Sequence, residues 1–221
     1  MARVNLPYGI DNFEKVRESN CYYIDKTDFI RELLDRTFDV NLITRPRRFG
    51  KTLTMSMLAE FFDIRKDSRK LFEGLEIVKH TEFCSEWMNQ WPVLFLTLKD
   101  VQGRSFDSAY GMVQFVISSV CGEHDYLSDS DKVSEADKRV FHRLLEQSGT
   151  STDVKTALFV LMRMMKAHYG KEVILLIDEY DVPLAKASDN GYYGEMLEVI
   201  RSLLGMTWKS NPNLKFAVVT G

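Results

Sequence analysis

Residues 41–58 read N-L-I-T-R-P-R-R-F-G-K-T-L-T-M-S-M-L, and they constrain the fold more than any other stretch of the chain. A short apolar run leads into a basic turn that ends in Gly50-Lys51-Thr52, and apolar side chains then recur at helical spacing. A strand, a loop of phosphate-binding size and a helix form the context in which a P-loop occurs. The stretch therefore predicts a nucleotide-binding α/β fold.

The turn has the chemistry that a nucleotide polyphosphate requires. Backbone N–H groups at the start of a helix have no partner within the helix, and they attract anions. Lys51 would place a positive charge on the β- and γ-phosphates, and the Thr52 hydroxyl would ligate Mg²⁺. We predict that ATP and Mg²⁺ bind here, and the expected phosphate-binding residues are Arg47, Arg48, Phe49, Gly50, Lys51, Thr52 and Leu53.

The turn departs from the pattern G-x-x-x-x-G-K-[ST] at Arg45, where the pattern has glycine. Pro46 follows, and a residue before proline is pushed toward extended backbone. Arg45 therefore does not require the conformational freedom of glycine, and we interpret the turn as a P-loop variant. Since a G-K-T sequence alone is a weak signal, a nucleotide site needs a second motif.

Residues 171–181, K-E-V-I-L-L-I-D-E-Y-D, supply that second motif. Five consecutive apolar residues, 173–177, predict a strand buried on both faces of a parallel sheet. The strand ends in Asp178 and Glu179, of which the first could hold a metal with its water shell and the second could deprotonate an attacking water. A strand that simply leaves the sheet into a polar turn gives the same pattern. The upstream G-K-T turn favours a Walker B motif with a catalytic glutamate.

Length, net charge and cysteine content limit the classes of protein to which the chain can belong. At 221 residues one domain is expected, and a net charge of −3 argues against a protein that coats a polyanion. The three cysteines lack C-x-x-C spacing and favour free thiols in a reducing compartment. Neither a signal sequence nor an apolar stretch of membrane-spanning length is found, so we expect no membrane contact and a cytoplasmic location.

Apolar periodicity predicts strands that alternate with helices, without hairpin signals, and therefore a parallel sheet sandwiched by helices. We divide the chain into a lead-in segment with a short helix, 1–37, and a P-loop ATPase core, 38–221. Within the lead-in, 1–26 is expected to be irregular. The expected linking stretches are 64–91 and 122–137, and the expected later elements are strands 92–98, 173–177 and 214–219 and helices 106–120, 135–147, 153–169 and 193–208.

With these residues placed, the chain resembles a bacterial family of AAA-ATPase-like proteins over nearly its whole length. The resemblance implies an additional-strand P-loop fold of the AAA/STAND type that binds and hydrolyses ATP, and it makes the R-P-R-R-F-G-K-T turn the family's own P-loop variant. It rests on L-P-Y-G-I-D-N-F-E-K-V-R (6–17), C-Y-Y-I-D-K-T (21–27), L-I-T-R-P-R-R-F-G-K-T-L (42–53), F-F-D-I (61–64), L-F-E-G-L (71–75), L-I-D-E-Y-D-V-P-L (176–184) and F-A-V-V-T-G (216–221).

The resemblance assigns roles to matching residues. It makes Lys51 the phosphate lysine and Thr52 a magnesium ligand, with Asp178 as the Walker B acid and Glu179 as the catalytic base. It also implies that Thr220 is a sensor residue beside the γ-phosphate.

Other residues have open assignments. Asp25-Lys26-Thr27 matches a family motif of unknown role, and Arg48 fits either a phosphate contact or a solvated loop position. Arg201 is a candidate finger toward a neighbouring subunit. The aromatic residues of the lead-in fit either adenine stacking or core packing, and they are Phe13, Tyr22 and Tyr23.

Members of the family typically carry a C-terminal PD-(D/E)XK nuclease-like domain, which is the only route to DNA that we predict. Compared with the family, this sequence stops before the fifth strand and the lid. We therefore expect a core that is incomplete at its C-terminus. The P-loop strand should then be an exposed sheet edge, which invites self-association.

Three functions remain open at this point. The first is a Mg²⁺-dependent ATPase core, and the second is a nucleotide-binding switch or interaction module without significant turnover. The third is a small-molecule kinase, which we rank last because adjacent carboxylates fit activation of water better than binding of an acceptor. No N-K-x-D sequence is present, which favours ATP over GTP.

Overall fold

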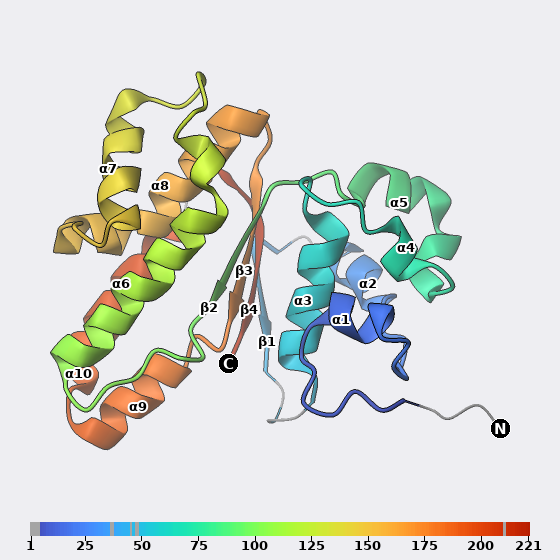
Figure 1. Cartoon of the computed structure of the whole chain (residues 1–221), viewed down its shortest axis with the longest axis horizontal. Coiled ribbons are helices and arrows are strands. Elements are labelled where there is room, and N and C mark those ends of the chain that lie inside the picture. Colours follow the sequence, from blue (N-terminus) through green and yellow to red (C-terminus); the bar gives the residue numbers. More distant parts are fainter. Residues whose placement is uncertain (1–4, 36–37, 45, 47–48, 210) are drawn as a thin grey trace.

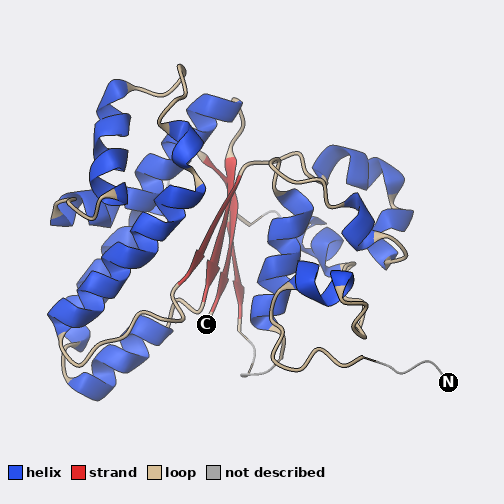
Figure 2. Cartoon of the chain, viewed as in Figure 1, coloured by secondary structure: helices blue, strands red, loops and turns tan. Residues whose placement is uncertain are grey.

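The computed structural model describes residues 5–35, 38–44, 46, 49–209 and 211–221, and it shows a parallel sheet between two layers of helices (Figure 1, Figure 2). In this part of the chain the sheet has four strands in the order β1-β4-β3-β2. The strands are β1 (Val40–Ile43), β2 (Val93–Thr97), β3 (Val173–Asp178) and β4 (Leu214–Thr220).

Within the described residues, five α-helices lie on each face of the sheet. On the face at the right of Figure 1 lie α1 (Phe13–Glu18), α2 (Phe29–Asp35), α3 (Lys51–Phe62), α4 (Arg69–Phe72), the 3₁₀ helix η1 (Glu76–Lys79) and α5 (Thr81–Trp87). On the opposite face lie α6 (Phe106–Glu123), the 3₁₀ helix η2 (Asp125–Leu127), α7 (Glu135–Leu145), α8 (Ser151–Tyr169), α9 (Val182–Asn190) and α10 (Tyr193–Trp208).

The central strand β3 explains why the sheet needs both layers. All six of its residues are buried. Successive side chains point to opposite faces, so Leu175 and Ile177 pack with α6, α8 and α10, whereas Ile174 and Leu176 pack with α3 and the short helices near it. A strand that is apolar on both sides is stable only when both faces are covered. The predicted parallel sheet sandwiched by helices is therefore confirmed.

Two regions for which no helix was predicted contain helices. The segment 1–26 includes α1, because the Asn12 side chain accepts a hydrogen bond from Lys15 N at 2.9 Å and Phe13 and Val16 are buried on one side. The stretch 64–91 includes α4, η1 and α5, and Phe72 of α4 and Phe83 of α5 pack on Phe61 of α3.

Two further differences concern the opposite layer. Helix α6 continues past its predicted end to Glu123, and η2 follows it, so the predicted loop 122–137 is irregular only in part. Helix α9 was not predicted. It has proline in its first turn and ends at Gly191 in left-handed conformation, which are start and stop signals of a short helix. Three methionines of α8, Met162, Met164 and Met165, are buried in the core.

Strand β1 lies at one edge of the described sheet, as predicted. Two apolar side chains of this strand are exposed, with Val40 at 36% and Leu42 at 55%. An edge strand with exposed apolar side chains can pair with another strand. Self-association along this edge stays a prediction.

Helix α8 begins with a capping box that an arginine reinforces. Thr150 N donates to Asp153 Oδ2 at 2.9 Å, and Arg143 donates to both carboxylate oxygens, at 3.0 and 2.8 Å. The bonds from Arg143 are the main reason that the pKa of Asp153 falls from 3.8 to about 2. The ionised carboxylate therefore ties the start of α8 to α7.

We predict that Asp153→Asn lowers the free energy of unfolding by about 1 kcal/mol at pH 7, since it removes a charged cap. A depressed pKa in the folded state stabilises the protein above the unfolded pKa, and this stabilisation is lost as the pH falls toward 2. Urea unfolding should show the difference from the parent at pH 7 and its decline below pH 4. An equal deficit at all pH values would contradict this account, and exposed Asp189→Asn serves as the control.

Candidate functional site

The predicted site residues meet at the carboxyl edge of the sheet. Ile43, the last residue of β1, is paired in register with Thr220, and Thr97 at the end of β2 is paired with Asp178. Since all four strands are parallel, the loop after β1 leaves the sheet at the same edge at which Thr220 and Asp178 lie. Two motifs more than a hundred residues apart in the sequence therefore lie together.

The start of α3 has the geometry of an anion site. Gly50 is the N-cap with φ of +74°, a left-handed conformation that glycine adopts at little cost. Glycine has no side chain with which to cap α3, so the first N–H groups are left for another acceptor. Lys51 and Thr52 form the first positions of this 12-residue helix. The predicted phosphate-binding residues Arg47 and Arg48, and Arg45 before them, lie outside the described residues.

Asp178 is the most unusual charged residue of the site, because its exposed fraction is 0%. Its Oδ1 accepts a hydrogen bond from the Thr220 hydroxyl. Its Oδ2 is buried and has no hydrogen-bond partner among the described residues. A buried carboxylate oxygen is costly to leave unpaired, so an unpaired one indicates a partner such as a metal ion or its water shell.

Thr220 also holds the segment that follows Asp178. Its hydroxyl oxygen accepts a hydrogen bond from Glu179 N at 3.2 Å, and its backbone oxygen accepts one from Tyr180 N at 3.0 Å. Glu179 has φ of +53°, and this left-handed conformation costs a non-glycine residue about 1–2 kcal/mol. The two bonds from β4 therefore fix the backbone of the predicted catalytic base in a strained conformation, a feature typical of functional sites.

The Lys51 ammonium reaches the end of β4. Its Nζ donates to Gly221 O at 2.7 Å, across 170 residues of sequence. Gly221 itself lies against the ring of Tyr180, and a Cβ added there would be 2.6 Å from Tyr180 Cε1. Only glycine fits so close to the ring without a shift. Lys51, the strand that ends in Thr220 and the segment after Asp178 thus form one connected unit.

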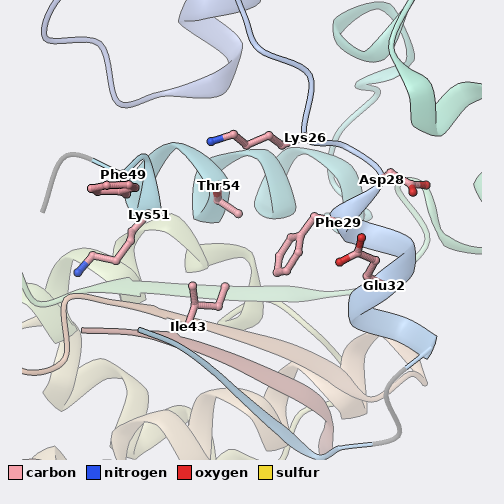
Figure 3. A pocket seen from close by; sticks show the side chains of 8 residues that line it. All are labelled: Lys26, Asp28, Phe29, Glu32, Ile43, Phe49, Lys51 and Thr54. Atoms are coloured by element: carbon pink, nitrogen blue, oxygen red, sulfur yellow. The ribbon is translucent and has the colours of Figure 1, made fainter. Parts of the chain in front are cut away.

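Two cavities flank the first turns of α3. The first, which we call the Glu32 cavity, has a volume of about 340 Å³. Figure 3 shows the side chains of Phe29 and Glu32 from α2 and Ile43 from β1 around it, with Lys51 at the opposite end. The second, the Tyr22 cavity, has about 410 Å³ and is lined mainly by apolar and aromatic residues of the lead-in and of α3. Both are in the size range of ligand pockets.

The three residues predicted as candidates for base stacking differ in how deeply they are buried. Phe13 is fully buried and packs on Tyr23 and Phe72, so it belongs to the core, and stacking of Phe13 on a base is ruled out. Tyr23 is half-buried, its hydroxyl donates to Met57 Sδ at 3.3 Å, and burial raises its pKa to about 12. Tyr22 is 56% exposed and lines the Tyr22 cavity. Of these three candidates, Tyr22 is the most exposed, and it stays a candidate for base stacking.

The remaining predicted residues are found in different places. Phe49 is 59% exposed and lines both cavities, and Leu53 lines the Tyr22 cavity. Arg201 is exposed on α10, in the helical layer on the other face of the sheet from α3 (Figure 1). The structure therefore groups Phe49 and Leu53 with the phosphate loop, and it does not group Arg201 with them.

The model of a protein family described as predicted AAA-ATPase matches residues 7–221. The chain belongs to this AAA-ATPase-like family. It is also similar to an uncharacterized protein from the vnfD 5′ region of Azotobacter chroococcum mcd 1, with 27% identity over 223 residues. That match covers all of this chain and 38% of the relative, so the chain spans well under half of the relative's length.

Membership of the AAA-ATPase-like family supports nucleotide binding in general. No solved structure matches this chain. None of the helices in the described ranges has both the length and the apolar character that a bilayer-spanning helix needs.

The hydrogen bond between Thr220 and Asp178 can be tested by its effect on folding. We predict that Thr220→Val lowers the free energy of unfolding by about 1–3 kcal/mol, because it leaves both oxygens of a buried carboxylate without a partner. Urea unfolding measures the loss. Thr220→Ser retains the hydroxyl and should remain much closer to the parent. Equal losses in the two variants would show that the methyl group, and not the hydroxyl, stabilises this position.

Proposed function

We propose that this chain binds ATP and hydrolyses it to ADP and phosphate in a Mg²⁺-dependent reaction. The observation that carries the proposal is the buried, unpaired Oδ2 of Asp178 at the sheet edge where the loop before α3 begins. A helix N-terminus that binds anions and a buried carboxylate that lacks a partner are the two halves of a site for a metal-bound polyphosphate. Family membership supports the nucleotide.

The side chains available as metal ligands at this site fit Mg²⁺ better than a metal ion that is bound by protein ligands alone. Among the described residues, no group of three or more His, Cys, Asp or Glu side chains could hold a metal ion. Mg²⁺ usually binds through one or two protein ligands together with waters and substrate phosphates. Thr52 and Asp178 would be those ligands. When bound, Mg²⁺ neutralises charge that develops on the phosphates.

Each remaining residue has a role that follows from its position. The N–H groups at the start of α3 and the Lys51 ammonium bind the β- and γ-phosphates, and Lys51 leaves the Gly221 carbonyl oxygen to do so. Glu179 accepts a proton from the attacking water. Thr220 holds Asp178 and the backbone of Glu179, and it acts as the sensor of the terminal phosphate.

The alternative is a nucleotide-binding switch or interaction module without significant turnover. The bond from Lys51 to Gly221 favours this reading, because occupancy of the phosphate site would release the end of β4. Both functions need the same phosphate site, and they differ in whether Glu179 performs chemistry. Contact with DNA and the activity of a longer protein stay predictions about segments outside this chain.

We predict that Glu179→Gln retains ATP affinity and lowers the hydrolysis rate by at least about 100-fold, the range expected for loss of a general base. Lys51→Ala should lose both binding and hydrolysis. Phosphate release and direct ATP titration measure the two quantities. Glu172→Gln, just before the opposite end of the same strand, is the matched control and should behave as the parent.

Three outcomes separate the alternatives. Binding of ATP by the parent without turnover above that of Glu179→Gln would favour the switch. Transfer of phosphate to an acceptor other than water would favour the kinase. Binding that is unaffected by Lys51→Ala would contradict the phosphate site itself.

A further inference from the structure

The segment Asp25-Lys26-Thr27 is fixed by hydrogen bonds on both sides of its lysine. Asp25 Oδ1 accepts from Thr27 N at 2.8 Å and from Thr27 Oγ1 at 2.7 Å. Asp25 Oδ2 accepts from Glu76 N at 2.7 Å, and Thr27 Oγ1 accepts from Ile77 N at 3.2 Å. We call these four bonds the Asp25–Thr27 clamp. They join the lead-in to η1.

Two features stabilise the hydrogen bonds of the clamp. Thr27 is completely buried, so its hydroxyl is shielded from competing water. Burial of Asp25 raises its pKa, but the bonds from Thr27 and from Glu76 N outweigh this effect, and the net pKa lies below its ordinary value. The carboxylate is therefore ionised at neutral pH, and its bonds have the strength of charge-assisted hydrogen bonds.

Lys26, between the two clamp residues, is exposed, and its ammonium forms no hydrogen bond or ion pair with any described residue. Its side chain lines the Glu32 cavity and also the Tyr22 cavity. In Figure 3 it extends along α3, with its nitrogen directed toward the end of the helix where Phe49 and Lys51 lie. The backbone of Lys26 is thus fixed, while its ammonium has no partner among the described residues and lies beside the start of α3.

Two lysines and a helix N-terminus therefore border one cavity. Lys51 and Lys26 both line the Glu32 cavity, and the positive end of the α3 dipole lies beside them. Two carboxylates, Asp28 and Glu32, also line this cavity, but in Figure 3 they lie at the end away from Lys51. Positive charge is therefore concentrated at the end beside the phosphate loop, where an anion would be attracted. Lys51 reaches toward the sheet edge and Gly221, where Asp178 would bind the metal, whereas Lys26 approaches from the lead-in, on the other side of α3.

We propose that Lys26 is a second phosphate-binding lysine, held in place by the Asp25–Thr27 clamp, and that it contacts the phosphate nearest the nucleoside. This inference rests on the proposed function. Lys51 serves the terminal phosphates at the sheet edge. The two cavities beside the start of α3 offer space for the nucleoside, and Lys26 borders both. A lysine binds phosphate as a mobile point charge, so the clamp needs to fix only its backbone.

The test measures ATP affinity of the whole chain at several salt concentrations. Lys26→Met should weaken ATP binding about tenfold, which is about 1.4 kcal/mol. It should also make the dependence on salt shallower, because one charge contact is lost. Lys26→Arg keeps the charge and should recover most of the affinity. Lys15→Met is the matched control, since Lys15 is an exposed lysine of the lead-in that lines neither cavity.

The clamp has a test of its own. Asp25→Asn should weaken ATP binding in the parent and have little further effect in Lys26→Met, because both changes act on one contact. Thermal unfolding of each variant separates this result from a loss of fold. Unchanged affinity in Lys26→Met, or a loss with an unchanged salt dependence, would overturn the inference. If Lys51→Ala abolishes ATP binding and Lys26→Met leaves the affinity unchanged, this inference fails while the proposed function stands.

Discussion

The hydrogen bond from the Thr220 hydroxyl to the buried Asp178 carboxylate is the interaction on which the rest of the site depends. It joins the ends of β3 and β4, and the same threonine fixes the backbone of Glu179 and Tyr180. A charged group with no exposed surface is tolerated only when its oxygens are satisfied. One oxygen is satisfied by Thr220, and the other is left for a ligand.

The fold provides the setting for this bond. Helices on both faces bury β3 completely and thereby exclude water from Asp178. The parallel register brings the loop before α3 to the edge of the sheet at which Asp178 lies. Lys51 then links α3 to the end of β4 through Gly221. The lead-in adds Lys26 from the outer side of α3 through the Asp25–Thr27 clamp. The proposed phosphate site is thus assembled from four segments of the chain: the lead-in, the start of α3, the end of β3 and the end of β4.

Sequence patterns predicted the elements that have strong periodicity and missed those that depend on tertiary contacts. The apolar run before Asp178 predicted β3, and 193–208 predicted α10 with its observed bounds. Helix α1 was missed because it has only six residues and is stabilised by packing of Phe13 on Phe72, far along the chain. The left-handed Glu179 and the contact of Gly221 with Tyr180 leave no local signal, since both arise from strands brought together by folding.

The most direct test of the account is the Mg²⁺ dependence of ATP affinity, measured by titration into the parent and into Asp178→Asn. We predict that Mg²⁺ strengthens ATP binding to the parent and that Asp178→Asn removes this gain while leaving the affinity without Mg²⁺ nearly unchanged. The asparagine keeps the shape of the side chain and an acceptor for Thr220. The same gain from Mg²⁺ in both proteins would contradict the claim that the unpaired oxygen of Asp178 is the metal-binding group of this site.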